Sequence, residues 1–450
     1  MSAFNVAKFG GTSVANFEAM SRCAEIIENN PKTKLLVSSA CSGVTNLLVE
    51  LANGVQDDQR RQTIIKQLEV IHYAITDQLA DPDKTKQAVA SLLKSVASAA
   101  EAASFQSSDK LTDHMVAYGE RMSTHILTQI LVERGVNAVR FNIREIMRTD
   151  SFFGKAEPEL GTISELAKEK LVPLCQNHVV VTQGFIGADK EGNTTTFGRG
   201  GSDYSAALIA EAVAAKGLEI WTDVPGIYTT DPRIAEKASP IAEISFSEAS
   251  EMANFGAKIL HPSTLVPALR HGIPVFVGSS KAPEKGGTWI RQEVESSPLF
   301  RALALRSNQT MVTLRSPNMF HAYGFLAEVF KILAKYKISV DLITTSEVSV
   351  SLTLDQTNTS GGAPELPAEV RKELEQLCVV EVEQNLCLVA LIGNNMSQCK
   401  GYAKKVFGTL EEFNLRMICY GASPHNLCFL VHSNDSRKVI QKLHQELFEC

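Results

Sequence analysis

The sequence lacks any hydrophobic run long enough to cross a bilayer, since it contains no stretch of about 18 consecutive apolar residues. Its first residues also lack the basic and then apolar pattern of a secretory signal. Net charge is equally scarce. A formal charge of −6 over 450 residues gives no basic field to attract nucleic acid or an anionic membrane. We therefore expect a cytoplasmic protein with no nucleic-acid partner and no membrane partner.

Paired cysteines are absent as well. The nine cysteines are scattered, with no C-x-x-C pair and no Cys/His cluster at zinc spacing. Such an odd and irregular set favours reduced thiols over a disulfide framework. What the chain does have is 44% apolar and 21% charged residues, which is typical of a globular protein with an ample core. Its length argues for two or three domains.

Short apolar runs alternate with helical patterns from Phe4 to about Gly278. Several of the runs are apolar almost throughout, as in strands that are buried on both faces of a largely parallel sheet. These runs are KLLVSSA, NAVRFNI, HVVVTQGFIG, LEIWTDV and IPVFVGSS. Helical segments such as FEAMSRCAEIIEN, TLVPALRHG and residues 56–105 lie between them. The element order predicts a layered α/β domain, and a Lys-, Glu-, Gly- and Pro-rich stretch places a boundary near residues 285–300.

An internal repeat follows this boundary. At an offset of 77 residues Asn318 matches Asn395, Gly324 matches Gly401 and Ser346 matches Ser423. In each copy the pattern predicts a strand, a loop, a helix and two strands, followed by a further helix. We infer a duplication that produced two paired α/β modules. Because RALALR and VVEVEQ occupy matching places before the two copies, an exchange of strands between the modules stays open.

The two copies agree in their apolar positions and differ in their polar ones. The first copy has His321, Asp341, Thr345 and Glu347, where the second has Gln398, Ile418, Ala422 and Pro424. Acidic groups at Asp341 and Glu347 suit a ligand with a positively charged end, such as lysine. A solvated loop is the alternative for either acid alone.

A glycine-rich turn joins the first strand to the first helix in KFGGTS. Backbone N–H groups and a helix N-terminus there favour an anion, and Lys8 adds a positive charge beside Gly10 and Gly11. The motif is neither a Walker A loop nor G-x-G-x-x-G, so a structural turn is an open alternative.

A second glycine-rich turn, TTTFGRGGSDYSAAL, strengthens the phosphate interpretation. Arg199 lies among three glycines, where a planar anion can approach it, although Ser202 or Asp203 could simply cap the helix that follows. A third loop, WTDVPGIYTTDPR, follows a strand, where ligands bind in open sheets. Tyr228 in this loop could instead be an ordinary packing residue. Lys258 in FGAKILHP could extend its ammonium along apolar neighbours to solvent. Glu120 in YGERMS could be a solvated surface residue.

These motifs, with SACSGVTN at residues 39–46, resemble the aspartokinases of the amino acid kinase superfamily, and among them the lysine-sensitive ones. The resemblance covers the whole chain, because aspartokinases also end in paired ACT modules. It implies a three-layer amino acid kinase domain with a mostly parallel sheet in residues 1–292. Two ferredoxin-like ACT modules would follow in residues 300–385 and 386–450. The implied reaction is the ATP-dependent phosphorylation of the β-carboxylate of L-aspartate, the first step towards lysine, threonine and methionine, inhibited by L-lysine.

The resemblance also implies a role for each residue that matches a motif. The catalytic residues would be Lys8, Asp203 and Lys258. Aspartate would be bound by Ser39, Thr45, Glu120, Arg199 and Ser202, with Glu120 taking the α-ammonium and Arg199 the α-carboxylate. The nucleotide would be bound by Gly10, Gly11, Thr12, Ser13, Thr222, Asp223, Tyr228 and Arg233. Lysine would be bound by Met319, His321, Gly324, Phe325, Ser339, Val340, Asp341, Ser346 and Glu347.

Mg²⁺ would accompany ATP, with no metal ligand assigned, and the ACT modules would form a homodimer. Two other interpretations stay open. One is a different amino acid or carbamate kinase of the same superfamily, which the paired tail modules speak against. The other is an inactive amino-acid sensor, which would be expected to lose Lys8, Asp203 or Lys258, and all three are present.

Overall fold

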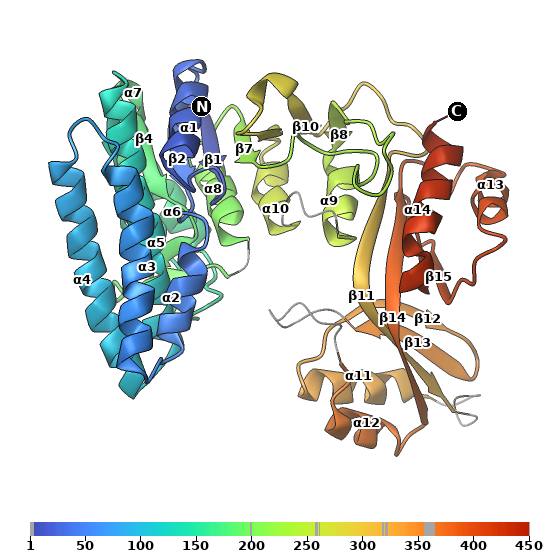
Figure 1. The fold of residues 1–450 in the computed structure, drawn as a ribbon. Helices are drawn as coiled ribbons and strands as arrows, with labels where there is room; N and C mark the ends of the chain where they lie inside the picture. The colour runs from blue at the N-terminus through green and yellow to red at the C-terminus, as the bar shows by residue number, and fades with distance from the viewer. Residues whose placement is uncertain are drawn as a thin grey trace. The chain divides into compact units, whose positions relative to one another are not determined.

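The computed structural model describes residues 4–198, 200–256, 260, 262–316, 319, 323–354 and 365–449 (Figure 1). The chain forms two compact units, each built from several segments. Unit 1 comprises Met1–Ile227, Pro240–Phe246 and Ile259–Val294. Unit 2 comprises Tyr228–Ser239, Ser247–Lys258 and Glu295–Cys450. Two segments that interrupt unit 1 in the sequence, residues 228–239 and 247–258, thus pack with the C-terminal part of the chain.

Unit 1 is built on an eight-stranded sheet with a small two-stranded sheet beside it. Its strands are β1 (Asn5–Phe9), β2 (Thr33–Ser38), β3 (Ala138–Arg140), β4 (Val179–Gln183), β5 (Ile186–Ala188), β6 (Thr194–Thr196), β7 (Leu218–Thr222), β8 (Glu243–Ser245), β9 (Val275–Ser279) and β10 (Gly287–Arg291). Its helices are α1 (Phe17–Glu28), α2 (Val44–Ala52), α3 (Asp58–Thr76), α4 (Asp83–Phe105), α5 (Asp109–Glu133), α6 (Leu160–Leu166), α7 (Val172–Asn177), α8 (Gly201–Ala212) and α10 (Pro262–Arg270). Short helical turns are η1 (Ile143–Glu145), η2 (Ala167–Leu171) and η3 (Pro283–Lys285).

The large sheet has the strand order β3-β4-β2-β1-β7-β9-β10-β8. Every adjacent pair is parallel except β9 with β10. The five apolar runs of the sequence form β2, β3, β4, β7 and β9, so the prediction of a mostly parallel sheet is confirmed. HVVVTQGFIG contains a break that the pattern did not show, because Phe185 adopts a φ of 72° between β4 and β5.

Two helical layers cover this sheet. Ala7 and Phe9 of β1 belong to the core that packs against α1 to α5. Lys8 lies between them in the strand, and alternate side chains of a strand point to opposite faces. Its side chain therefore lies on the other face, where it pairs with Asp203 of α8.

Unit 2 contains one antiparallel sheet in the order β12-β13-β11-β14-β16-β15. Its strands are β11 (Ala302–Arg315), β12 (Val340–Thr345), β13 (Ser349–Leu354), β14 (Val379–Ile392), β15 (Met417–Tyr420) and β16 (Asn426–His432). Its helices are α11 (Phe325–Lys335), α12 (Ala368–Leu374), α13 (Tyr402–Thr409) and α14 (Ser433–Phe448), together with α9 (Phe246–Asn254), whose residues from Ser247 on belong to this unit.

The long strands β11 and β14 run side by side and each contributes to two modules (Figure 1). In the first module, residues 311–315 pair with β13 and with residues 379–383. In the second, residues 302–306 pair with residues 388–392, and residues 386–392 pair with β16. Each long strand changes register near an asparagine with a positive φ, Asn308 at 57° and Asn385 at 60°. The two asparagines are 77 residues apart, the offset of the repeat.

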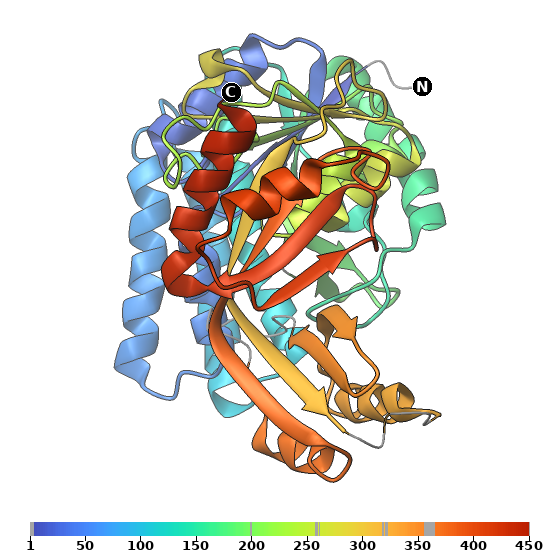
Figure 2. The same ribbon diagram turned by 90° about the vertical axis from the view of Figure 1, so that its right-hand side faces the viewer.

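Each module has its own hydrophobic core. In the first, Val329 and Leu333 of α11 and Val370 and Leu374 of α12 pack on the strands. In the second, α13 and α14 cover one face of the half-sheet, with Val439, Ile440 and Leu443 of α14 fully buried (Figure 2).

Candidate active site

A cavity of about 530 Å³ opens in unit 1 at the carboxyl ends of β4, β2, β1 and β7, four neighbouring strands of the sheet. In an open α/β sheet this edge is where ligands bind. The cavity is lined by Lys8, Gly10, Gly11, Thr12, Ser39, Ala40, Cys41, Ser42, Gly43, Thr45, Glu120, Phe185, Gly198, Gly200, Gly201, Ser202, Asp203 and Thr222. Both glycine-rich turns and SACSGVTN therefore meet at one place.

The turn after β1 is held close to its neighbours by backbone contacts. Gly10 N donates to Trp221 O over 3.1 Å, and a Cβ at Gly11 would lie only 3.0 Å from Ala40 O. A Cβ at Gly10 would lie 3.5 Å from the Lys8 ammonium. The absence of side chains here thus brings the Lys8 charge and the backbone of three strand ends together.

The start of α8 forms the opposite wall. Gly200 precedes the helix with a φ of 73°, and a Cβ at Gly201 would lie 2.7 Å from the Phe185 ring. Asp203, in the first turn of α8, forms an ion pair with Lys8. Its carboxylate therefore orients the lysine ammonium rather than capping the helix.

Glu120 of α5 is the most deeply buried acid of the cavity, with 3% of the residue exposed. Its Oε1 accepts a 3.1 Å hydrogen bond from Ala40 N, while Oε2 has no hydrogen-bond partner among the described residues. Burial raises the pKa of Glu120 to about 8, against the opposing effects of the Ala40 N–H and of the Lys8 charge. Within the described part of the chain, the site therefore presents a buried carboxyl oxygen that has no hydrogen-bond partner.

Asp113 is a supporting residue that no sequence motif marked. Its carboxylate accepts hydrogen bonds from Gly154 N, Thr196 N and the Thr196 hydroxyl, at 2.9, 2.9 and 2.7 Å. It thereby fastens α5 to β6, three residues before Arg199 in the sequence. Phe185, which lines the cavity, also escaped sequence analysis, because nothing in its local pattern marks the turn after β4.

Most of the predicted substrate and nucleotide residues line this cavity, and the others lie elsewhere. Ser13 is buried and bonds the Ser280 hydroxyl at 2.6 Å, so it ties the turn to β9. Asp223 is exposed, and Thr222 Oγ1 donates to it over 3.2 Å. Tyr228 and Arg233 belong to unit 2, where the exposed Arg233 guanidinium pairs with Asp231 at 2.7 Å. Arg199 and Lys258 lie outside the described residues.

The predicted lysine-binding residues lie at two ends of the first module. At one end, Ser316 N donates to Val348 O and Met319 N to Ser316 O, which brings Met319 near the turn with Ser346 and Glu347. Gly324 and Phe325 begin α11 after the same loop. At the other end, Ser339 precedes β12, which begins with Val340 and Asp341, and Asp341 pairs with Arg306 at 2.7 Å. His321 lies outside the described residues.

Other kinds of site find no support in the described part of the chain. There, no helix is both long and apolar enough to span a membrane. Nor do three or more His, Cys, Asp or Glu side chains gather in those residues in a way that would hold a metal ion. Of the described residues that line the cavity, Glu120 and Asp203 are the acidic ones.

Comparison with known proteins identifies the family. The sequence profile of the amino acid kinase family matches residues 3–279, and that of the ACT domain matches residues 312–362 and 389–447. Over 450 residues, the whole of both chains, the sequence is 55% identical to the lysine-sensitive aspartokinase 3 of Escherichia coli (strain K12). The chain belongs to the aspartokinase family.

Two crystal structures of E. coli aspartokinase III extend this result to the fold. One is a complex with aspartate and ADP in the R-state, with a TM-score of 0.89, and the other a complex with lysine and aspartate in the T-state, with a TM-score of 0.86. Each is 54% identical to this chain and matches 99% of it and 100% of the crystallised chain. The family resemblance of the motifs and the expected fold class are confirmed.

Proposed function

We propose that this aspartokinase transfers the γ-phosphoryl group of MgATP to the β-carboxylate of L-aspartate, releasing 4-phospho-L-aspartate and ADP, and that L-lysine inhibits it. The family membership supports the reaction. The single observation that carries it in the structure is the cavity at the ends of β1 and β2, where Lys8, two glycine-rich turns and the buried Glu120 meet.

The nucleophile needs no general base. A side-chain carboxyl group has an ordinary pKa near 4, so the β-carboxylate of aspartate is already an anion at neutral pH. The difficulty is the approach of one anion to another. Phosphoryl transfer is helped mainly by alignment and by positive charge around the migrating group.

This chain supplies that charge from several groups. Lys8 lies in the cavity, held by Asp203, and the turn at Gly10 and Gly11 and the N-terminus of α8 line it, where the positive end of the helix dipole favours an anion. Lys258 is proposed as a second cation on the phosphates. Mg²⁺ enters as part of MgATP. Cations of this kind are commonly held by substrate phosphates with one or two carboxylates, which fits a cavity with few acids.

Aspartate is proposed to bind through both of its α-substituents. Its α-ammonium would meet Glu120 Oε2, the buried oxygen for which the described residues provide no partner, and so complete that carboxylate's hydrogen bonds. Arg199 would take the α-carboxylate by bidentate pairing. Ser39, Thr45 and Ser202 border the same cavity.

Lysine inhibition is proposed to act through the first module of a homodimer. The strand β12 separates Asp341 from Ser346 by about 16 Å, at about 3.3 Å per residue. One free lysine is too short to contact both ends of that strand in one chain. Two copies related by a two-fold axis would bring one end of each together. The exposed apolar side chains of Leu326, Phe330, Ile343 and Val348 support such a partner surface.

The direct test is ADP release from MgATP with L-aspartate, titrated with L-lysine, in an enzyme that we expect in the cytoplasm. Aspartate-dependent turnover that lysine suppresses is the expected result. Turnover without lysine sensitivity would reject the effector assignment alone. No turnover by a folded protein that binds ATP would reject the kinase assignment and favour an amino-acid sensor.

A further inference from the structure

Four arginines gather at one edge strand of the large sheet in unit 1, and we call them the arginine cluster. They are Arg121 of α5, Arg140 at the end of β3, Arg144 of η1 and Arg148, which forms a β-bridge with Ala188 of β5. The edge strand β3 packs against α5 and is parallel to β4, so its carboxyl end lies at the sheet edge where ligands bind. The residues that line the cavity of unit 1 include none of the four.

One face of α5 contributes to this cluster. His114, Tyr118, Arg121 and His125 follow one another at helical spacing and therefore share a face. The Tyr118 hydroxyl lies 3.0 Å from His114 Nε2, and the Arg121 guanidinium lies over the Tyr118 ring, 4.8 Å from its centre. Glu120 comes one residue before Arg121, and successive side chains of a helix point about 100° apart. The cavity and the arginine cluster thus use different faces of α5.

The arginines are close enough to act on one another. Burial lowers the pKa of Arg140 and that of Arg144, and the charge of Arg121 lowers both further. Arg148 also lowers the pKa of Arg144. Burial, together with the charges of Arg140 and Arg121, lowers the pKa of His125 to about 4. Like charges therefore meet in a place that is partly removed from water.

The acids of this region do not balance the arginines. Glu145 acts on Arg140 and Asp189 acts on Arg144, each in the direction that favours the charged guanidinium. The Asp189 carboxylate already accepts hydrogen bonds from the backbone N–H and the side-chain amide of Asn193, at 2.8 and 2.9 Å. No member of the arginine cluster forms an ion pair with the described residues. Two acids thus oppose four arginines.

Most hydrogen-bond donors of the cluster are unused as well. Each guanidinium carries five N–H donors. Within the described residues the four side chains make one hydrogen bond, from Arg144 Nη2 to Gly192 O over 2.7 Å. Arg144 Nε is buried and finds no hydrogen-bond partner in that part of the chain. A buried donor without a partner costs free energy, which an acceptor on a ligand would recover.

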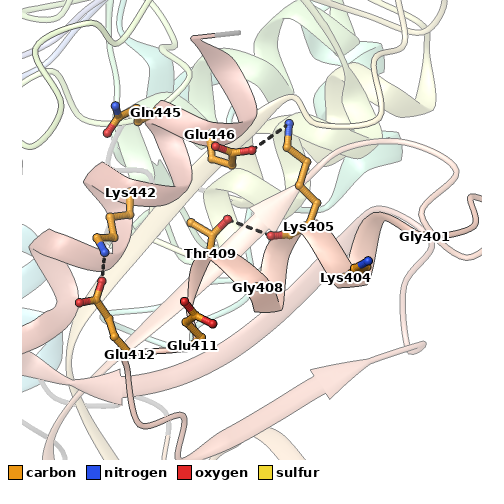
Figure 3. Close-up of a pocket in the computed structure, with 10 residues that line it drawn as sticks. All are labelled: Gly401, Lys404, Lys405, Gly408, Thr409, Glu411, Glu412, Lys442, Gln445 and Glu446. Atoms are coloured by element: carbon orange, nitrogen blue, oxygen red, sulfur yellow. Dashed lines mark hydrogen bonds and ion pairs between the residues drawn. The ribbon is translucent and has the colours of Figure 1, made fainter.

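Basic side chains in the groove between α13 and α14 are arranged differently (Figure 3). There Lys442 pairs with Glu412, and Lys405 pairs with Glu446 at 3.6 Å. The three lysines that line this groove are matched by three glutamates. An excess of positive charge is therefore a feature of the arginine cluster and not of that groove.

We propose that the arginine cluster is a binding site for a small phosphate-bearing anion, either inorganic phosphate or a phosphate monoester. A guanidinium presents a planar fork of donors to an oxyanion. Because these forks come from a helix, a strand end and a loop, they suit a tetrahedral group with oxygens in several directions better than a planar carboxylate. A phosphate dianion also offsets the excess of positive charge. The site is separate from the cavity and does not depend on the reaction proposed above.

The test measures the binding of inorganic phosphate and of glycerol 3-phosphate to the full chain by calorimetry at fixed ionic strength. The variant R121A/R140A removes two members of the cluster. The control R60A/R134A removes two arginines of the same unit that pair with Glu50 and Glu28. The loss of two charge-assisted contacts should raise the dissociation constant of the phosphate probe about tenfold or more in R121A/R140A, and R60A/R134A should match the wild type. Tighter binding of glycerol 3-phosphate identifies a monoester as the ligand, and tighter binding of inorganic phosphate the free ion.

Two further variants complete the test. Lys8→Ala removes the cation of the cavity and should keep the phosphate site of the cluster. R121K/R140K keeps both charges without the forks, so its affinity for phosphate should lie between those of the wild type and R121A/R140A, and it serves if the alanine variant does not fold.

Equal phosphate affinity in R121A/R140A and R60A/R134A would overturn the proposal, as would wild-type affinity in R121K/R140K. Loss of phosphate binding in Lys8→Ala alone would place the anion in the cavity and would also overturn it. Tighter binding of succinate than of either phosphate probe would reject the class of ligand.

Discussion

The two regulatory modules share a fold and a repeat, yet corresponding residues have different partners. In the first, Ser346 Oγ lies 2.7 Å from Ser349 Oγ at the turn between β12 and β13. In the second, the counterparts Ser423 and Asn426 donate to the two carboxylate oxygens of Glu251 in α9, over 2.5 and 2.7 Å. The position where we propose that the first module binds lysine is thus occupied in the second by Glu251.

The same difference extends along the modules. Asp341 of the first pairs with Arg306, while its counterpart Ile418 is an exposed apolar residue. The second module also binds Glu248 of α9 and the segment 228–239. After duplication, one copy thus kept polar groups that suit a charged effector, and the other became the support for two segments of the kinase sequence.

Removing the Glu248 carboxylate, which binds α9 to the second module, should have the largest effect on stability. Glu248 is fully buried and its Oε1 accepts from Arg301 and Asn394 over 2.7 and 2.6 Å. Glu248→Ala would leave Arg301 buried without its partner, at a cost of about 3 kcal/mol or more in the free energy of unfolding. Urea unfolding measures this loss. The control is Glu328→Ala, which breaks the exposed pair of the first module with Lys331 and should change little. An equal loss of unfolding free energy in Glu248→Ala and Glu328→Ala would contradict the difference between the two modules.

Removing Asp341 from the first module should weaken lysine inhibition and spare turnover. Asp341→Ala should raise the lysine concentration for half-inhibition by about 10- to 100-fold, because a charge-assisted hydrogen bond is worth about 1.5–3 kcal/mol. Inhibition curves at fixed MgATP and aspartate measure the shift. Ile418→Ala, at the corresponding position of the second module, should leave the curve in place. Normal inhibition of Asp341→Ala would refute the assignment.

The pH dependence of the free energy of unfolding tests the difference between the carboxyl groups of Glu120 and Glu251. Among the described residues Glu120 Oε2 has no hydrogen-bond partner, and the pKa of Glu120 is raised to about 8 from an ordinary value of 4.5, whereas both carboxylate oxygens of Glu251 accept hydrogen bonds. Between these two pH values the folded protein holds a proton that the unfolded chain releases. The free energy of unfolding should therefore fall as pH rises from about 5 to about 8, by at most about 1.4 kcal/mol per unit.

Aspartate should change this proton balance. Its ammonium lowers the pKa of Glu120, so binding near pH 7 should release close to one proton, seen by calorimetry in buffers of different ionisation enthalpy. Glu120→Gln should abolish the release and weaken aspartate binding, and Glu251→Gln should leave the release unchanged. Release that persists in Glu120→Gln would assign the proton to another group.

Much of the fold and of the lining of the cavity in unit 1 followed from the sequence, because both depend on local pattern. Apolar runs predicted β2, β3, β4, β7 and β9, and glycines after strands predicted the turns that line the cavity. The pairing of residues 228–239 with α14 could not be predicted. It depends on side chains such as Arg437 that bind backbone carbonyls some 200 residues away, and such donors carry no sequence signal.

The smallest effect concerns the bend that the two modules share. Asn308 and Asn385 adopt left-handed backbone conformations where β11 and β14 pass from one module to the other. Asn385→Ala should cost about 1 kcal/mol in the free energy of unfolding, since the left-handed region disfavours residues with a plain Cβ. Asn385→Gly should be close to neutral. Thermal unfolding of the three proteins checks this order, and an alanine variant as stable as the glycine one would contradict it.

The division of labour between the modules is tested most directly by the number of lysine molecules that each chain binds. Calorimetric titration of the full-length protein with L-lysine should give one site per chain, lost in Asp341→Ala and retained in Ile418→Ala. Two sites per chain, or one site that survives Asp341→Ala, would show that the second module also binds the effector and would contradict the account.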